Sequence, residues 1–156
     1  MNTNEQKFVN EDTYKYWSKR CPPAPGDIVY TREAPIGEVA IIPVNTKICL
    51  GQRMMLIRPF RKLMLKEYLK IVLMGPDFLK QLEGVQIGAT VKHLRVGDVE
   101  NAMIPIPPLE EQKEIVKKIK NLFKTCNELE KQINSSKVNS EMLMQAVLKE
   151  AFENDK

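Results

Sequence analysis

The sequence predicts an α+β protein: a mostly antiparallel, β-rich globular head with two or three short helices, followed by a long C-terminal α-helix that forms a coiled coil. Three observations lead to this class. Short apolar runs separated by Gly, Pro and Asn occupy residues 27–59, as is typical of strands. A proline-rich segment follows at residues 104–108. Beyond it, apolar residues recur at spacings of four and three, which indicates a heptad stripe. We therefore expect a head of residues 1–108 and a helix of residues 109–153.

Within the head, apolar runs and turn residues indicate the individual elements. The expected strands are residues 27–32, 38–43, 47–50, 54–59 and, after a turn at 98–101, 102–106. The first two form a hairpin around Pro35-Ile36-Gly37. Helices are expected at residues 11–20, 65–74 and 78–82, with Asp77 as the N-cap of the last one.

The junction between head and helix is the most informative stretch. Pro105, Pro107 and Pro108 donate no backbone hydrogen bond, so this segment is extended and lies outside a sheet interior. Proline suits the first turn of a helix, and the negative charges of Glu110 and Glu111 suit its N-terminus. A long helix is therefore predicted to begin at residue 109.

The stripe of that helix consists of Ile115, Ile119, Leu122, Cys126, Leu129, Ile133, Leu143 and Val147. It weakens at Asn134-Ser135-Ser136, where a kink or break is possible because Ser and Asn are poor mid-helix residues. Some 40 residues at a rise of 1.5 Å make about 60 Å, whereas a body of about 100 residues has a radius of gyration near 13 Å. We expect a homodimer through this helix; the alternative is that the helix packs on its own head.

Charge separates the two parts. Residues 13–95 carry fourteen Lys and Arg against six Asp and Glu, whereas residues 109–156 carry nine of each sign. A basic head with a neutral helix indicates a head that faces a polyanion and a helix that faces protein. The alternative is that the basic residues only keep the surface soluble.

Several function classes are disfavoured. No run of about 18 apolar residues exists, so no membrane segment is expected. The N-terminus is polar and acidic, unlike a secretory signal, and the three cysteines are widely spaced, as in a cytoplasmic protein with reduced thiols. His93 is the only histidine, and neither a metal-ligand spacing nor a glycine-rich phosphate loop is present. We expect no enzyme activity, cofactor or metal.

Six stretches, in this order and spacing, together resemble a known family. They are residues 26–32, 36–40, 50–53, 88–94, 104–112 and 148–152, that is GDIVYTR, IGEVA, LGQR, GATVKHL, IPIPPLEEQ and LKEAF. The chain resembles, over about residues 9–153, a target recognition domain and its following helix in the DNA-specificity (S) subunit of Type I restriction-modification enzymes. Fewer residues precede the proline-rich segment than is usual in that family.

The resemblance implies a non-catalytic subunit. Each recognition domain of such a subunit reads half of a bipartite sequence in double-stranded DNA from the major groove. The long helices pair into a coiled-coil spacer that binds methyltransferase (M) subunits, in complexes that also contain restriction (R) subunits. A different expectation follows from the short N-terminal part: a coiled-coil assembly or interaction protein, derived from such a subunit, that no longer binds DNA by itself.

Candidate DNA-binding residues follow from side-chain chemistry at strand ends and in a glycine-rich loop. They are Thr31, Arg32, Gln52, Arg53, Thr90, Lys92 and His93. Arg and Gln make bidentate contacts to guanine and adenine edges, although phosphate contacts are commoner for any single basic residue. The structural alternatives are an internal ion pair for one arginine, for example with Asp27, and a plain surface position for His93. Arg58, Arg61 and Lys62 around Pro59 are expected to form a solvated turn.

Overall fold

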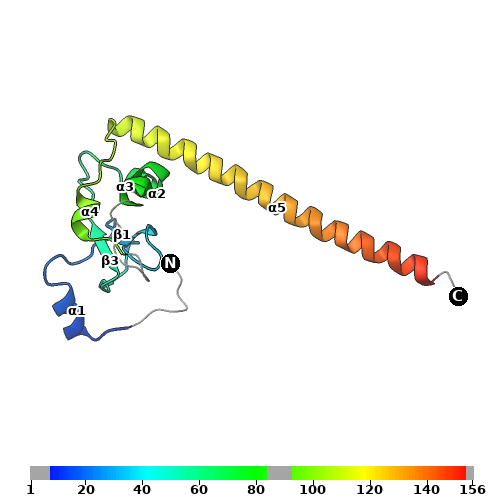
Figure 1. The fold of residues 1–156 in the computed structure, drawn as a ribbon, viewed down its shortest axis with the longest axis horizontal. Coiled ribbons are helices and arrows are strands. Elements are labelled where there is room, and N and C mark those ends of the chain that lie inside the picture. The colour runs from blue at the N-terminus through cyan, green and yellow to red at the C-terminus, as the bar shows by residue number, and fades with distance from the viewer. Residues whose placement is uncertain (1–7, 84–92, 154–156) are drawn as a thin grey trace. The chain divides into compact units, whose positions relative to one another are not determined.

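The central strand of the head is β1 (Ile28–Thr31), which pairs antiparallel with β2 (Val39–Ile41) on one side and β3 (Met54–Ile57) on the other. Val29 lies opposite Ala40 in one pairing and opposite Leu56 in the other. The computed structural model describes residues 8–83 and 93–153 (Figure 1). The chain divides into two compact units, one up to Val116 and one from Lys117 onward, and each is considered by itself.

One face of the sheet carries the core. Side chains alternate along a strand, so Ile28 and Tyr30 point together into the interior, where both are fully buried. The helices α2 (Lys66–Met74) and α3 (Pro76–Glu83) contribute to the same core, and the Tyr30 and Phe78 rings meet edge to face with centroids 6.1 Å apart. The buried core is completed by Met64, Tyr68, Leu69, Leu73, Leu82, Leu94, Val99 and Val116.

The hairpin between β1 and β2 depends on Gly37. Its φ of +92° lies in a region that side-chain-bearing residues rarely adopt. A Cβ at this position would also come within 2.9 Å of Cδ2 of Leu79. Gly37 N donates to Thr31 O at 3.0 Å, which closes the turn. The backbone of the turn therefore requires glycine here, and a larger residue would also displace the end of the Leu79 side chain.

Two predicted strands are absent from the described structure. Residues 47–50 form no strand, because they line a hollow on the second face of the sheet instead of pairing at the outer edge of β2 or β3. Residues 102–106 also form no strand, since the side-chain amide of Gln81 takes the place of a neighbouring strand. Its Oε1 accepts from Met103 N at 2.9 Å, and its Nε2 donates to Met103 O at 3.0 Å.

Other element boundaries differ by a turn or less. The first helix, α1 (Glu11–Trp17), ends before residue 20. Asp77 is not an N-cap, because α3 already begins at Pro76, a residue that the first turn accepts readily. The predicted turn at 98–101 is mostly a short helix, α4 (Val96–Glu100), whose first turn is closed by Asp98 Oδ2 accepting from Arg95 N at 3.1 Å.

The last helix, α5 (Leu109–Glu153), begins inside the head unit. Gln112 is fully buried there, and its side-chain amide forms three hydrogen bonds. Oε1 accepts from Leu65 N at 2.8 Å, and Nε2 donates to the carbonyls of Leu63 at 2.7 Å and Pro107 at 2.8 Å. Gln112 thus joins the proline-rich segment, the turn before α2 and the first turn of α5.

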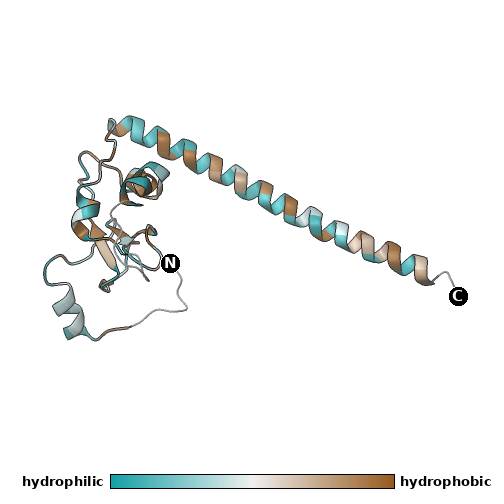
Figure 2. Cartoon of the chain, in the orientation of Figure 1, coloured by the Kyte–Doolittle hydropathy of each residue, from teal (hydrophilic) through white to brown (hydrophobic). Residues whose placement is uncertain are grey.

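From Lys117 onward, α5 is one uninterrupted helix, including Asn134–Ser136 where a break had been considered possible. Ser140 Oγ donates to the Ser136 carbonyl at 2.9 Å, so this hydroxyl is satisfied within the helix. Figure 2 shows apolar and polar bands alternating along α5. Across residues 8–83 and 93–153, no helix has the length and apolar character needed to cross a membrane.

Candidate nucleic-acid interface

Four of the sequence-predicted DNA-binding residues gather where β1 ends and β3 begins, namely Arg32, Gln52, Arg53 and His93. Arg32 N donates to the Arg53 carbonyl at 2.8 Å, which extends the β1–β3 pairing by one step. On its other side, Leu94 N donates to the Arg32 carbonyl at 3.0 Å, and Glu33 pairs with His93 in an isolated antiparallel bridge. The fold therefore brings together three segments that are distant in sequence.

The Arg32 side chain holds these segments together. Its Nη1 donates to the Leu94 carbonyl at 3.1 Å, and its Nη2 donates to the Gln52 carbonyl. A planar guanidinium fork suits two fixed carbonyls at once. Because both terminal nitrogens already donate to backbone, this geometry favours a structural role for Arg32, through two carbonyls and not through the ion pair that was the alternative. Its predicted DNA contact stays a prediction.

Unlike Arg32, Arg53 and Gln52 have side chains that are exposed to solvent. The Arg53 side chain is 72% exposed, and its Nε lies 3.6 Å from Oε1 of Glu33, a long and partly solvated ion pair. Gln52 is exposed and His93 is half-buried. An exposed arginine beside an exposed glutamine can present donors and an acceptor to a base edge or to phosphate. These two residues are the best placed for contact among the described candidates.

Thr31 contacts the β1–β2 hairpin and not the cluster around Arg32. Its Oγ1 accepts from Glu38 N at 2.9 Å across the hairpin, and it lines a hollow on the second face of the sheet. Thr90 and Lys92 lie outside the described residues, so their predicted DNA contacts stay predictions.

Asp27 does form an internal ion pair, but its partner is Arg58, for which the sequence predicts a solvated turn. Arg58 Nη2 lies 2.6 Å from Oδ2 of Asp27 and its Nε lies 2.9 Å from Oδ1, a bidentate pair with a fully buried carboxylate. Hydrogen bonding by Arg58 lowers the pKa of Asp27 and outweighs the burial of the carboxylate, which raises it; the amide of Ala24, at 2.9 Å, lowers it further. The same pair raises the pKa of Arg58. For Arg58 the expectation of a solvated turn was wrong, because the turn folds back on residues 22–27, where Arg58 Nη2 also donates to Pro22 O. Arg61 and Lys62 are exposed, as expected.

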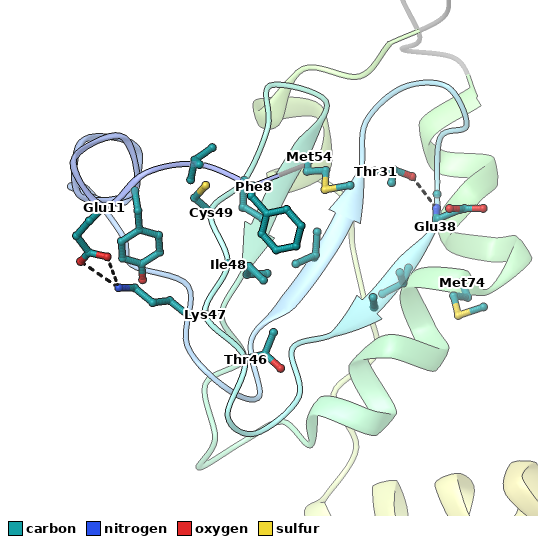
Figure 3. Close-up of a pocket in the computed structure, with 17 residues that line it drawn as sticks. Phe8, Glu11, Thr31, Glu38, Thr46, Lys47, Ile48, Cys49, Met54 and Met74 are labelled. Atoms are coloured by element: carbon teal, nitrogen blue, oxygen red, sulfur yellow. Dashed lines mark hydrogen bonds and ion pairs between the residues drawn. The ribbon is translucent and has the colours of Figure 1, made fainter. Parts of the chain in front are cut away.

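A hollow of about 960 Å³ lies on the second face of the sheet (Figure 3). Val29, Ala40 and Met54 form its floor, and residues 8–14 and 46–50 form its walls. At its rim Lys47 Nζ lies 2.8 Å from Glu11 Oε2 and 4.3 Å from the centre of the Tyr14 ring. The hollow offers an apolar surface with one charge pair that is already neutralised.

Sequence reasoning missed several of these residues. For Gln112 a signal existed: it precedes Ile115 by three positions, so it lies on the stripe face of α5, where a polar residue needs partners. For Lys47 and Arg58 no local signal existed, because their partners lie more than 30 positions away. Within the described residues, no group of three or more His, Cys, Asp and Glu is placed to hold a metal ion.

The predicted coiled-coil residues divide at the unit boundary. Ile115 is partly buried against the head core. In the second unit, the stripe from Leu122 to Val147 is exposed in this single chain, and Leu122, Leu129, Ile133, Leu143 and Val147 are each more than half exposed. Cys126 is exposed as well, whereas Ile119 is of intermediate exposure. An apolar seam of this length on a helix is typical of an interaction surface.

Comparison with known proteins covers the head unit and part or all of the helix beyond it. A family model described as the Type I restriction modification DNA specificity domain matches residues 1–136. The EcoBI specificity subunit of Escherichia coli is 29% identical over 147 residues, which are 94% of this chain and 31% of that subunit. The EcoAI specificity subunit of Escherichia coli is 34% identical over 92 residues, which are 58% of this chain and 16% of that subunit.

Solved structures agree with the fold. The HsdS subunit from Thermoanaerobacter tengcongensis aligns with a TM-score of 0.70 and 26% identity, covering 80% of this chain and 33% of that one. A chain from a structure of the type I R-M system aligns with a TM-score of 0.71 and 26% identity, covering 83% and 34%. This chain spans about a third of the length of the EcoBI subunit and of these two solved chains.

Proposed function

From the premise that this chain belongs to the Type I restriction modification DNA specificity domain family, we propose that it is a non-catalytic DNA-recognition module. Its head reads one half of a bipartite double-stranded target, and its helix pairs with another helix to set the spacing and to dock methyltransferase subunits. The observation that carries this proposal is the combination, in one chain, of a basic head that matches the family and a helix with an exposed apolar stripe.

For DNA contact, the proposal places Arg53 and Gln52 nearest the DNA, with Arg32 positioning their loop. Arg32 holds the Gln52 carbonyl and the Leu94 carbonyl, so the loop of residues 51–53 and the segment at His93 keep a fixed separation. Because this loop is already held in place, it loses less conformational entropy when it binds DNA. Lys92, next to His93 in sequence, adds a further positive charge for phosphate.

For pairing, the charges of α5 favour an antiparallel homodimer. Residues 113–124 carry five lysines and one glutamate, whereas residues 128–153 carry three lysines and five glutamates. A parallel pair would place the two lysine-rich halves side by side. An antiparallel pair places each of them beside a glutamate-rich half, which lowers the repulsion along the seam.

The test is DNA binding by fluorescence anisotropy with a random-sequence duplex, at several salt concentrations, with and without a methyltransferase subunit. We expect affinity to fall with salt, each contacted phosphate adding about 0.9 to the slope of log K against log salt. Light scattering on the same samples reports the oligomeric state. A dimer that binds no duplex at low salt, even with the methyltransferase subunit, would overturn DNA recognition and favour the assembly protein.

A further inference from the structure

A carboxylate, that of Glu33, lies within the cluster formed by Arg32, Gln52, Arg53 and His93. The Glu33 backbone forms an antiparallel bridge with His93, and Glu33 directly follows Arg32, whose N donates to Arg53 O at 2.8 Å. The Glu33 side chain is 29% exposed, and its Oε1 lies 3.6 Å from Nε of Arg53. The fold therefore places a negative charge beside the cation that is best placed for DNA contact, where this charge repels a phosphate.

The ion pair with Glu33 uses one edge of the Arg53 guanidinium. The approach is through Nε, which leaves the edge formed by the two terminal nitrogens for another acceptor. A guanidinium is planar, and its five N–H donors form a fixed fork. Since the Arg53 side chain is 72% exposed, a ligand can reach that second edge from solvent.

A neighbouring carboxylate changes which DNA group suits Arg53. Arg53 and Glu33 together carry no net charge, so they attract a phosphate less strongly than an arginine alone does. A guanine edge is uncharged, and its O6 and N7 accept two parallel hydrogen bonds from an arginine fork. A separation of 3.6 Å is too long for a hydrogen bond, so the guanidinium can still adjust to a base. The pair is therefore better suited to a guanine edge than to phosphate.

We propose that Glu33 is a positioning residue that directs the terminal edge of Arg53 at a guanine in the major groove and disfavours its contact with phosphate. The backbone on both sides of the pair is held: Leu94 N donates to Arg32 O, and Arg32 Nη2 donates to Gln52 O. The carboxylate then restricts the rotamers of one long side chain before DNA arrives, which reduces the entropy lost on binding. The inference rests on the proposed DNA recognition and adds the base that Arg53 reads and the residue that selects it.

The test is in vitro selection from a duplex library with a randomised segment, using the full chain with the methyltransferase subunit. Sequencing of the bound DNA gives the base preference at every position. Arg53→Ala identifies the position that Arg53 reads, because it removes the preference there. Glu33→Gln is then compared with the parent at that position. The matched control is Glu38→Gln, which removes the same charge from an exposed site in the same hairpin connection.

We expect the parent to favour guanine at the Arg53 position by about ten-fold, and Glu33→Gln to reduce this preference by about three-fold or more. Both glutamine variants should bind a random-sequence duplex more tightly, since each loses a negative charge, whereas Glu38→Gln should keep the preference. Glu33→Asp keeps the charge but shortens the side chain, so it should lose the preference without that gain. Thermal melts of all three variants should match the parent, because an ion pair this exposed adds little stability.

The positioning role is overturned if the guanine preference survives in both Glu33 variants, or if Glu38→Gln reduces it equally. It is also overturned if both Glu33 variants melt early, since Glu33 is then a structural residue. If Arg53→Ala changes no single position of a selective parent, Arg53 contacts phosphate and the inference fails, while DNA recognition stands. A parent that selects no sequence overturns DNA recognition and the inference with it.

Discussion

Arg32 and Leu94 hold each other by two hydrogen bonds although 62 positions separate them in the chain. Nη1 of Arg32 donates to the Leu94 carbonyl at 3.1 Å, and the Leu94 amide donates to the Arg32 carbonyl at 3.0 Å. Leu94 is itself fully buried in the core. This connection sets the position of His93, and through Gln52 it sets the neighbouring loop.

Replacing Arg32 should therefore affect stability first. Lysine keeps the charge but lacks the fork that reaches two carbonyls. We expect Arg32→Lys to destabilise the head by about 1.5–3 kcal/mol, the range for hydrogen bonds to a charged group. Thermal melts followed by circular dichroism measure the change. Arg53→Lys is the control, since that side chain is mostly exposed and should change stability by less than about 0.5 kcal/mol. Equal melting of the two variants would refute the structural role.

Arg53→Ala should act on DNA binding and leave the melting temperature nearly unchanged. If Arg53 contacts a base, the loss is about 1–3 kcal/mol at one base position; if it contacts phosphate, all sequences weaken and the salt slope falls by about 1. Anisotropy titrations with a cognate duplex and a mismatched duplex distinguish the two contacts. Unchanged affinity and unchanged slope would remove Arg53 from the interface.

The Asp27–Arg58 pair predicts a particular acid sensitivity. The pKa of Asp27 is lowered in the folded state, chiefly by Arg58, so the pair contributes stability above the unfolded value of about 3.9. That contribution is lost as the pH falls through the folded pKa. We expect Asp27→Asn to lower the free energy of unfolding at pH 7 by about 1–3 kcal/mol. Below about pH 4, the free energy of unfolding of the variant should fall less steeply with pH than that of the parent. Urea melts at several pH values measure this. Glu83→Gln, at an exposed site, is the control. If the stability of Asp27→Asn and that of the parent fell identically with pH below about pH 4, the Asp27–Arg58 pair would not be the source of the acid sensitivity.

Leu129→Asp should produce monomers, because the carboxylate would be buried in the apolar seam. Sedimentation velocity at tens of micromolar measures the oligomeric state. Asn127→Asp adds the same charge to the same turn of α5, between the stripe residues Cys126 and Leu129 but outside the stripe, and should leave the dimer intact. A parent protein that is monomeric, or two variants that dissociate equally, would show that this stripe is not the pairing face.

Gln112→Leu should destabilise the head unit by about 1–3 kcal/mol for each buried backbone group left without its partner. The groups concerned are Leu65 N, Leu63 O and Pro107 O. Chemical denaturation measures the loss, and Glu111→Gln, exposed at the adjacent position, is the control. Should Gln112→Leu prove as stable as the parent, the three hydrogen bonds are not what holds the start of α5 to the head.

Local patterns predicted much of this protein. The β1–β2 hairpin, β3, the helix before Gly75 and the beginning of α5 at residue 109 each follow from residues close together in sequence. Two predicted strands, at residues 47–50 and 102–106, did not form. Strand pairing depends on contacts that are distant in sequence. Residues 47–50 line the hollow on the second face of the sheet instead of adding to an edge, and the Gln81 side chain forms hydrogen bonds with both backbone groups of Met103.

The heptad stripe and the proline-rich start of α5 were determined by the sequence, because helix periodicity and proline sterics act within a few residues. The roles of the arginines were decided by tertiary contacts. Arg32 and Arg58 directly follow a strand and Arg53 directly precedes one, so all three adjoin short strands. Arg32 donates to two backbone carbonyls, Arg53 is mostly exposed to solvent, and Arg58 pairs with a buried carboxylate. These differences arise because the partner groups lie 20 to 62 positions away in the sequence and are brought close only by the fold. A guanidinium has the same chemistry in all three places, and only the position of its acceptor in space distinguishes a structural residue from one that is available to DNA.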